Sequence, residues 1–319
     1  MTTLRSLAPV MCLLLAACGQ PYEVGTTAAE LTGTPLRYLA INVGNASPQY
    51  GCWEYKLCRS GDVANLRSYI ATWKPDVVLL TEVYRAAQLT GGMNYGPILP
   101  DGYTGVCGQS RDRYTGALAT YDASNASHEH ECIAWKKSRL SMVTGSALSA
   151  YGRNDAYGQS NCDYDFTGFK VNLTVDGAVP LTAVIAHPQA GSNSSCRTEE
   201  IARYWSTLAT GTRTIIGGDF NTESTAELQR PASFGINYSL GSHWGVWQHS
   251  EWTAFYVLGI KYKYDHAFSN FGSYCLDCGP TYGTASLQYG SVVGGYEGHP
   301  RADTGSGMDH RQILVDMQL

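Results

Sequence analysis

The sequence predicts an α/β (α+β) fold, a four-layer sandwich in which two mixed or antiparallel β-sheets pack face to face with helices outside. Two observations favour it. Short apolar runs are mixed with amphipathic stretches, and several neighbouring runs are close enough to be joined as hairpins. A doubly wound parallel sheet would instead need a long crossover between its consecutive strands.

The first predicted elements are a strand, a helix and a second strand. Leu36–Val43 has the apolar content of a strand. Asp62 can cap a helix that runs to Trp73, and Lys74-Pro75 ends it because a residue before proline avoids the helical conformation. Asp76–Glu82 is a continuous apolar run, typical of a buried strand, and it closes on a carboxylate.

Two antiparallel pairs follow in the middle of the chain. Tyr114–Tyr121 and Glu131–Lys136 are expected to pair with each other. Phe166–Val175 and Leu181–His187 are expected to form a hairpin around Asp176-Gly177, a dipeptide that favours a tight turn.

The last third of the chain begins with a predicted amphipathic helix, Thr198–Ala209, whose inward residues are Ile201, Tyr204, Trp205 and Leu208. Thr214–Ile216 then has the β-branched residues of a buried strand. Gly217 and Gly218 end that strand and let the backbone approach a neighbour closely. Tyr264–Ser269 and Arg311–Leu319 complete the predicted strands.

The N-terminal segment has the features of an export signal. Residues 1–17 hold one basic residue and a short apolar run, and they precede Cys18 in Leu15-Ala16-Ala17-Cys18. This arrangement resembles the bacterial lipobox, which implies cleavage before Cys18 and a lipid anchor on it. We expect a leader at 1–17, a tether at 18–35 and one domain at 36–319, in an exported envelope lipoprotein or extracellular protein. No protein partner is implied.

Charge and cysteine content agree with an exported protein. The formal net charge is −5, with no run of basic residues, so a polyanionic substrate would need a metal and local cations to offset its charge. Apart from Cys12 and Cys18, eight cysteines remain, an even number that indicates disulfides whose pairing the sequence leaves open. Cys52/Cys58 and Cys275/Cys278 are close enough to be local pairs, and Cys275-Leu-Asp-Cys278 could instead be half of a zinc site.

Hydrogen-bonding or ionisable residues stand at the ends of several predicted strands. They are Asn42, Glu82, His187, Asp219 with Asn221, and Asp265, and Asp309-His310 precedes the last strand. So many such endings indicate a site assembled at a single sheet edge. Asp219 and Asn221 are one residue apart, so at an extended strand end both side chains would lie on one face.

This series resembles the endonuclease/exonuclease/phosphatase superfamily, whose fold is that of deoxyribonuclease I. Six blocks match in order and span the mature domain: Leu39-Ala40-Ile41-Asn42, Pro75-Asp76 through Leu80-Thr81-Glu82-Val83, Val184-Ile185-Ala186-His187, Gly218-Asp219-Phe220-Asn221, Tyr264-Asp265-His266 and Met308-Asp309-His310. Each block alone is weakly specific, and their order and spacing carry the resemblance.

The resemblance implies a metal site and a substrate site. Glu82 is the main carboxylate for Mg²⁺, with Mn²⁺ or Ca²⁺ as alternatives, and Asn42 and Asp309 help to place the metal and the phosphate. Mg²⁺ takes few protein oxygens and keeps several waters, which fits so sparse a ligand set. Asp219 and Asn221 position the scissile phosphate or the attacking water.

The resemblance also implies two catalytic histidines. His310, oriented by Asp265, is a general base or acid, and His187 lies on the opposite side of the phosphate. In pancreatic deoxyribonuclease the second histidine has a carboxylate partner, and Asp112 stands at the matching place here. Two positions depart from the usual pattern: Met308 replaces a serine, and His266 follows Asp265, where we favour a structural histidine.

The resemblance leaves the substrate open. A secreted or surface endonuclease acting non-specifically on DNA is the first expectation. A sphingomyelinase-like phosphodiesterase is the alternative, because His187-Pro188-Gln189-Ala190 followed by Cys196 is similar to a segment of bacterial sphingomyelinases. The aromatic stretch Ser242–Tyr264 could stack bases or lie in a lipid interface, although core packing would account for most of it. A binding lipoprotein without catalysis ranks last, because all the residues that would carry the chemistry are present.

Overall fold

The computed structural model describes residues 34–43, 60–83, 89–91, 96–109, 130–151, 162, 167–224, 226–228, 254–255, 261–262, 264–271, 291–293 and 312–319. All of them belong to one compact unit, Thr32–Leu319. The expected leader and almost all of the expected tether lie outside the described residues, and Pro35 already belongs to the first strand. Within the described residues, no helix is both long enough and apolar enough to cross a membrane.

The first sheet is six-stranded and mixed. Its order is β13-β14-β1-β2-β4-β3, in which β1 and β2 are parallel and the other neighbours are antiparallel. The strands are β1 (Pro35–Asn42), β2 (Val77–Val83), β3 (Tyr103–Cys107), β4 (His130–Lys136), β13 (Ser291–Val293) and β14 (Gln312–Gln318). Helix α1 (Ser60–Trp73) connects the parallel pair, as a parallel connection requires.

The second sheet is also six-stranded, with the order β12-β9-β8-β7-β5 and with β6 paired to β7. Only β8 and β9 are parallel among its pairs, and helix α2 (Ser194–Thr207) connects them. The strands are β5 (Leu140–Met142), β6 (Leu148–Tyr151), β7 (Thr167–Val175), β8 (Val179–His187), β9 (Thr214–Asp219) and β12 (Asp265–Ser269). A separate short pair joins β10 (Ala254–Phe255) to β11 (Lys261–Tyr262).

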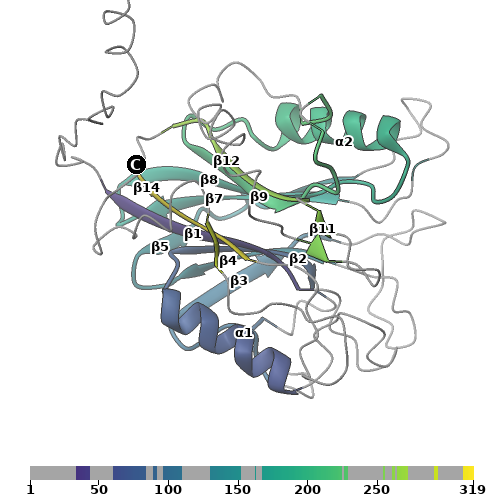
Figure 1. Cartoon of the computed structure of the whole chain (residues 1–319). Helices are drawn as coiled ribbons and strands as arrows, with labels where there is room; N and C mark the ends of the chain where they lie inside the picture. The colour runs from purple at the N-terminus through teal and green to yellow at the C-terminus, as the bar shows by residue number, and fades with distance from the viewer. Residues whose placement is uncertain are drawn as a thin grey trace, which may run out of the picture. The chain divides into compact units, whose positions relative to one another are not determined.

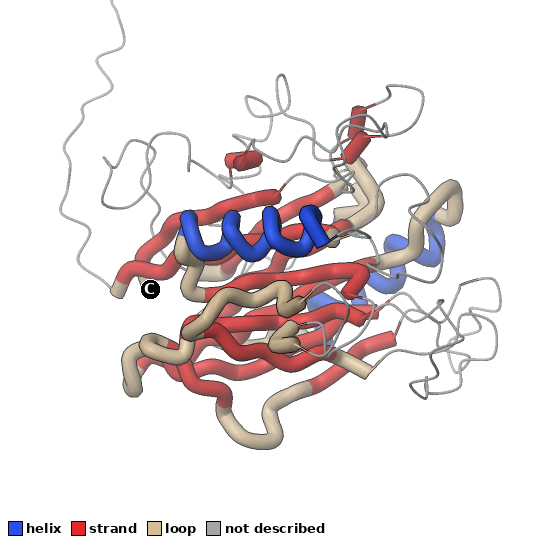
Figure 2. Tube along the Cα trace, turned by 90° about the horizontal axis from the view of Figure 1, so that it is seen from below, coloured by secondary structure: helices blue, strands red, loops and turns tan. Residues whose placement is uncertain are grey.

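Three apolar clusters bind these elements into four layers, as the fold class predicts. The central cluster fills the space between the two sheets with alternate strand residues, such as Leu79 of β2 and Ile185 of β8. A second cluster packs α1 on the outer face of the first sheet, and a third packs α2 on the outer face of the second. Figure 1 shows this order, with α1 and α2 on opposite sides of the paired sheets, and Figure 2 shows the same layers from the α1 side.

The structure confirms the predicted β7–β8 hairpin. Its strands pair from Thr167–His187 to Val175–Val179. The backbone N–H of Ala178 donates to the Val175 carbonyl over 3.1 Å, and Asp176 and Gly177 have φ values of 48° and 74°. Two positive φ values in succession define the tight turn that an Asp-Gly pair favours.

The expected partner of the strand at 131–136 is wrong. β4 pairs with β2 at one edge and with β3 (Tyr103–Cys107) at the other, so both of its partners differ from the one expected. Tyr114–Tyr121 itself lies outside the described residues. Helix α2 begins four residues earlier than predicted, because Asn193 accepts a hydrogen bond from the Cys196 N–H and caps it there.

Two disulfides lie within the described residues. Cys107–Cys132 joins facing residues of β3 and β4, and Cys162–Cys196 ties the first turn of α2 to a separate segment. The pairs proposed for Cys52/Cys58 and Cys275/Cys278, and the half zinc site at Cys275 and Cys278, lie outside the described residues.

Candidate active site

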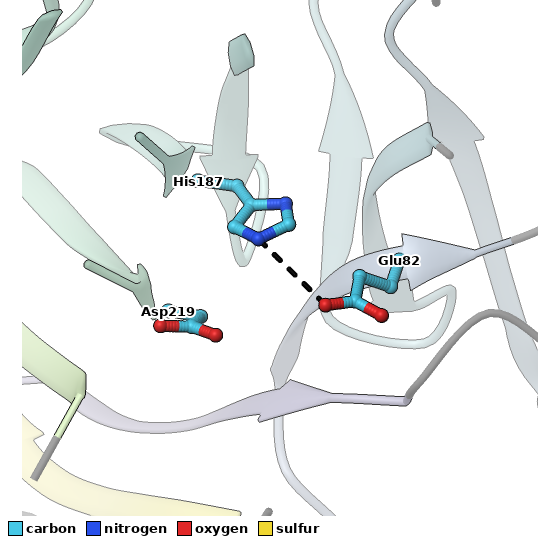
Figure 3. A group of neighbouring side chains, drawn as sticks. All are labelled: Glu82, His187 and Asp219. Carbon is cyan, nitrogen blue, oxygen red and sulfur yellow. Dashed lines mark ion pairs between the residues drawn. The ribbon is translucent and has the colours of Figure 1, made fainter. Parts of the chain in front are cut away.

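The ends of four strands from both sheets meet at one edge of the sandwich. Asn42 ends β1, Glu82 is the next-to-last residue of β2, His187 ends β8 and Asp219 ends β9. β1 and β2 are parallel, as are β8 and β9, so each pair delivers its last residues to the same edge. Figure 3 shows Glu82, His187 and Asp219 facing a common space.

The Asn42 amide joins the two carboxylates across the sheets. Its Nδ2 donates to Oε1 of Glu82 over 2.7 Å and to Oδ2 of Asp219 over 3.0 Å. Asn42 and Asp219 are 1% and 2% exposed, so the bond between them is shielded from water, whereas the bond to the half-buried Glu82 is partly accessible. One buried amide therefore sets the spacing of two acidic groups from different sheets.

The carboxylate of Glu131 holds His187 from the opposite side. Nδ1 of His187 lies 3.3 Å from Oε1 of Glu131, while Nε2 lies 3.7 Å from Oε1 of Glu82. The second oxygen of Glu131 accepts a hydrogen bond from the Thr167 hydroxyl. Both ring nitrogens thus have carboxylate neighbours, which fixes the plane of the imidazole and directs Nε2 toward the shared space.

The charge around His187 favours its protonated form. Burial lowers the pKa of the imidazole, but the hydrogen bond to Glu131 and the negative charges of Glu82, Asp219 and Glu131 outweigh burial and raise it to about 10. In the absence of another cation, His187 therefore carries a proton at neutral pH.

Local backbone geometry aims Glu82 into the site. The β2–β4 pairing shifts register between Leu80 and Val83, and Glu82 has a φ of 59°. A bulge of this kind turns a side chain away from the strand's regular alternation. A left-handed φ is costly for a residue other than glycine and is often found at functional sites.

The two glycines before Asp219 allow the close approach that the sequence predicts. At Gly218 φ is 142°, and an added Cβ would lie 2.2 Å from the carbonyl oxygen of Ala186 in β8. At Gly217 an added Cβ would lie 3.0 Å from the Cβ of Ala40 in the facing sheet. Strand β9 therefore contacts both β8 and β1 just before the carboxylate of Asp219.

Asn221 differs from the extended geometry that we expected. It lies beyond the end of β9 with a φ of 52°, so the strand alternation does not reach it. Its backbone N–H donates to Oδ1 of Asp219 over 2.8 Å, and its side-chain Nδ2 donates to the Pro188 carbonyl over 3.0 Å. Asn221 thus joins the ends of β8 and β9.

Asp265 and His266 lie on the strand next to β9. Asp265 is fully buried and pairs across from Asp219. Nε2 of His266 lies 2.6 Å from the Thr222 carbonyl, and its ring packs edge-on against Phe220 with centroids 5.6 Å apart. These contacts agree with the structural role expected for His266.

Glu82, His187 and Asp219 form a group that could hold a metal ion. One ligand atom of each lies within 4.8 Å of the others. Two carboxylates at such a distance repel each other, so a positive charge between them would be stabilising. Carboxylate oxygens suit Mg²⁺, and the His187 imidazole would widen the choice to Mn²⁺ and other transition metals only if it gave up its Nε2 proton to the cation. The set therefore fits a divalent cation.

A scan against protein-family models matches residues 41–280 to the Endonuclease/Exonuclease/phosphatase family. The chain belongs to this family. Its members are phosphoesterases and nucleases, and the chain is therefore assigned to this class of hydrolases. A search of curated proteins finds no match.

Solved structures of the same fold include a phosphatase, a protein complexed with a single-stranded DNA product and a catalytic domain with bound sulfate. A mannosyl-6-phosphatase from Bacteroides thetaiotaomicron VPI-5482 has a TM-score of 0.58 at 14% identity, with 89% of this chain and 100% of that chain covered. D. rerio TDP2 complexed with single strand DNA product has a TM-score of 0.55 at 16% identity, over 90% and 100%. The human Nocturnin catalytic domain with bound sulfate has a TM-score of 0.56 at 15% identity, over 89% and 93%. Identities this low show the shared fold alone.

The structure brings together most of the predicted site residues that it describes. Asn42, Glu82, His187 and Asp219 converge, Asn221 is tied to Asp219, and Asp265 lies on the neighbouring strand. The roles of His310, Asp309, Asp112 and Cys18 stay predictions, because these residues lie outside the described part of the chain.

Sequence reasoning missed Glu131 as a member of this site. It is 1% exposed and begins the apolar run of β4. Burying a charged group without a partner costs free energy, so a glutamate beside an apolar run could have indicated that Glu131 has a partner inside the fold.

Proposed function

We propose that this protein is a divalent-metal-dependent phosphodiester hydrolase, a secreted or surface endonuclease that acts non-specifically on DNA. The observation that carries the proposal is the convergence of Glu82, His187 and Asp219 at the edge shared by both sheets. Membership of a family of nucleases and phosphoesterases supports it, as does a relative of the same fold that binds a single-stranded DNA product.

Glu82 and Asp219 would hold the cation, and Asn42 would keep their carboxylates in register. A bound divalent cation would offset the charge of the phosphate oxygens and lower the pKa of a coordinated water. Asn42 and Asp309 as direct ligands, and the choice of Mg²⁺ over Mn²⁺ or Ca²⁺, remain part of the proposal.

His187 would act as the acid that protonates the leaving oxygen. Glu131 accepts from Nδ1 and keeps the second proton on Nε2, which faces the carboxylates and so the place of the phosphate. His310, oriented by Asp265, would activate the water from the opposite side in an in-line displacement. Water attacks phosphorus, the bond to the leaving oxygen breaks, and that oxygen takes the His187 proton.

Export as a lipid-anchored protein is part of the same proposal. Disulfides persist in oxidising compartments, and Cys107–Cys132 and Cys162–Cys196 are consistent with such a place. Lipid attachment at Cys18 is tested by mass spectrometry of the mature N-terminus, with Cys18→Ser as the control.

Plasmid cleavage tests the proposed activity. The protein without residues 1–17 is incubated with supercoiled DNA and Mg²⁺ or Mn²⁺, and EDTA gives the metal-free control. The variants His187→Ala, His310→Ala and Glu82→Ala are assayed in the same way. Nicking that needs metal and is lost in all three folded variants supports the proposal. The exposed, matched variant Glu199→Ala should cleave like the wild type.

Sphingomyelin and bis(p-nitrophenyl) phosphate are assayed in parallel. A folded protein that hydrolyses either compound but leaves DNA intact would contradict the endonuclease and favour the lipid or small-phosphoester alternative. A protein inactive on every substrate would favour the binding lipoprotein.

A further inference from the structure

Helix α2 holds the peptide of Gln189 from both sides. The backbone N–H of Gln189 donates to Oε2 of Glu200 over 2.6 Å, and the carbonyl of Gln189 accepts from Nη1 of Arg197 over 3.1 Å. The same Nη1 also donates to the Gly191 carbonyl over 2.7 Å. Two side chains one helical turn apart therefore replace the hydrogen bonds that a sheet would supply.

The segment held in this way leads directly out of the site. Strand β8 ends at His187, where its pairing with β7 also ends. The next residue, Pro188, accepts a hydrogen bond from the Asn221 side chain over 3.0 Å. The chain from His187 to Gln189 thus connects the candidate acid, the end of β9 and helix α2.

Burying the side chains of Arg197 and Glu200 costs free energy, and the packing of α2 on the sheet does not require it. Arg197 and Glu200 are 6% and 0% exposed, although charged residues are seldom buried without partners. Nε of Arg197 lies 2.6 Å from Oε2 of Glu227, which offsets the guanidinium charge. The apolar face of α2, with Ile201, Tyr204 and Trp205, already packs the helix on the sheet.

We infer that Glu200 and Arg197 are positioning residues for His187 and Asn221. They fix the Gln189 peptide, and the fixed peptide sets where β8 ends and where the Pro188 carbonyl meets Asn221. The inference rests on the proposed function only in so far as His187 and Asn221 serve catalysis. Loss of either contact is expected to lower kcat by about 10- to 100-fold with little change in KM, as for other residues that orient reacting groups.

The chemistry of Glu200 supplies a matched variant. Burial raises the pKa of its carboxyl to about 8, so the group is mostly neutral at pH 7. Glutamine has the same shape, is neutral and keeps an acceptor oxygen. Glu200→Gln should therefore retain the contact with Gln189, whereas Glu200→Ala removes it.

The test observes His187 without relying on activity. Imidazole resonances of the eight histidines are recorded by two-dimensional NMR over a pH series, and His187→Gln identifies the His187 signal. Wild type is compared with Glu200→Ala, Glu200→Gln, Arg197→Met and the exposed control Glu199→Ala, each with a thermal melt. Glu200→Asp and Arg197→Lys replace any variant that fails to fold.

Displaced His187 resonances in Glu200→Ala and Arg197→Met, with wild-type resonances in Glu200→Gln and Glu199→Ala, are the expected result. A lower melting temperature with an unmoved His187 signal would overturn the inference, because the contacts would then stabilise the fold alone. Absent phosphodiesterase activity in the wild type would overturn the proposed function, and the NMR comparison would still decide whether α2 positions His187.

Discussion

Substituting Gly218 by alanine tests the close approach of β9 to β8. An added Cβ would lie 2.2 Å from the Ala186 carbonyl oxygen and 3.1 Å from the Ala186 nitrogen. Both atoms belong to the backbone of a buried strand, so neither can move away as a side chain could. Occupying a φ of 142° costs on the order of 1–3 kcal/mol, and overpacking costs a similar amount. The free energy of unfolding should therefore fall by about 2–6 kcal/mol.

Gly177→Ala is the matched control for this prediction. Gly177 also has a positive φ, 74°, but its added Cβ would meet nothing within 4 Å. It should lose only the conformational term, about 1–2 kcal/mol. Urea unfolding followed by tryptophan fluorescence and circular dichroism measures both variants.

Equal losses for the two variants would refute the reasoning, because the contact with Ala186 would then contribute nothing. Metal affinity is a second measurement of the same change, because Asp219 is the residue after Gly218. If Gly218→Ala folds by shifting β9, the Asp219 carboxylate moves with it, and affinity for Mn²⁺ should fall together with stability.

Three further predictions concern the metal group, Glu200 and the strand disulfide. Glu82→Gln and Asp219→Asn should each weaken Mn²⁺ binding at least tenfold by calorimetry, and unchanged affinity in both would place the cation elsewhere. Unfolded Glu200 ionises above its ordinary pKa of 4.5, while the folded carboxyl stays protonated to about 8. Wild type should therefore lose stability relative to Glu200→Gln as pH rises between these values, and parallel pH–stability curves would contradict this. Removing Cys107–Cys132 by serine substitution of both cysteines opens a loop of 25 residues and should cost about 3 kcal/mol in urea unfolding, and a loss under 1 kcal/mol would argue against that crosslink.

Much of the site could be predicted because it lies where strands end. Asn42, Glu82, His187 and Asp219 each close an apolar run, and the parallel pairs β1–β2 and β8–β9 bring these ends to one edge. Apolar runs and the polar residues that end them are local features, so the sequence alone indicates them.

Glu131 was not predicted as a site residue, and the reason is topological. β4 runs antiparallel to β2, so the first residues of β4, not the last, reach the edge that carries the site. Only the pairing of the strands makes this evident, and the expected partner of β4 was wrong.

Arg197 and Glu200 were missed for another reason. They lie at helical spacing from Ile201 and Tyr204, on the buried face of α2, but a search for apolar periodicity passes over polar members of such a face. Their partners are backbone groups of Gln189, which the identity of the residue does not reveal.

The division of the site between two sheets has a consequence for variation in this protein. Glu82 and Glu131 come from one sheet, and His187 and Asp219 come from the other, so no hydrogen-bonded ladder fixes the separation between them. Besides the Asn42 amide, which joins Glu82 to Asp219, the residues that set it are apolar ones such as Leu79 and Ile185, in the core between the sheets. A change of volume there would slide one sheet against the other and alter the 3.7 Å separation of Glu82 and His187. Substitutions in the core between the sheets should therefore change the turnover rate, and a mutational survey confined to polar residues would overlook these positions.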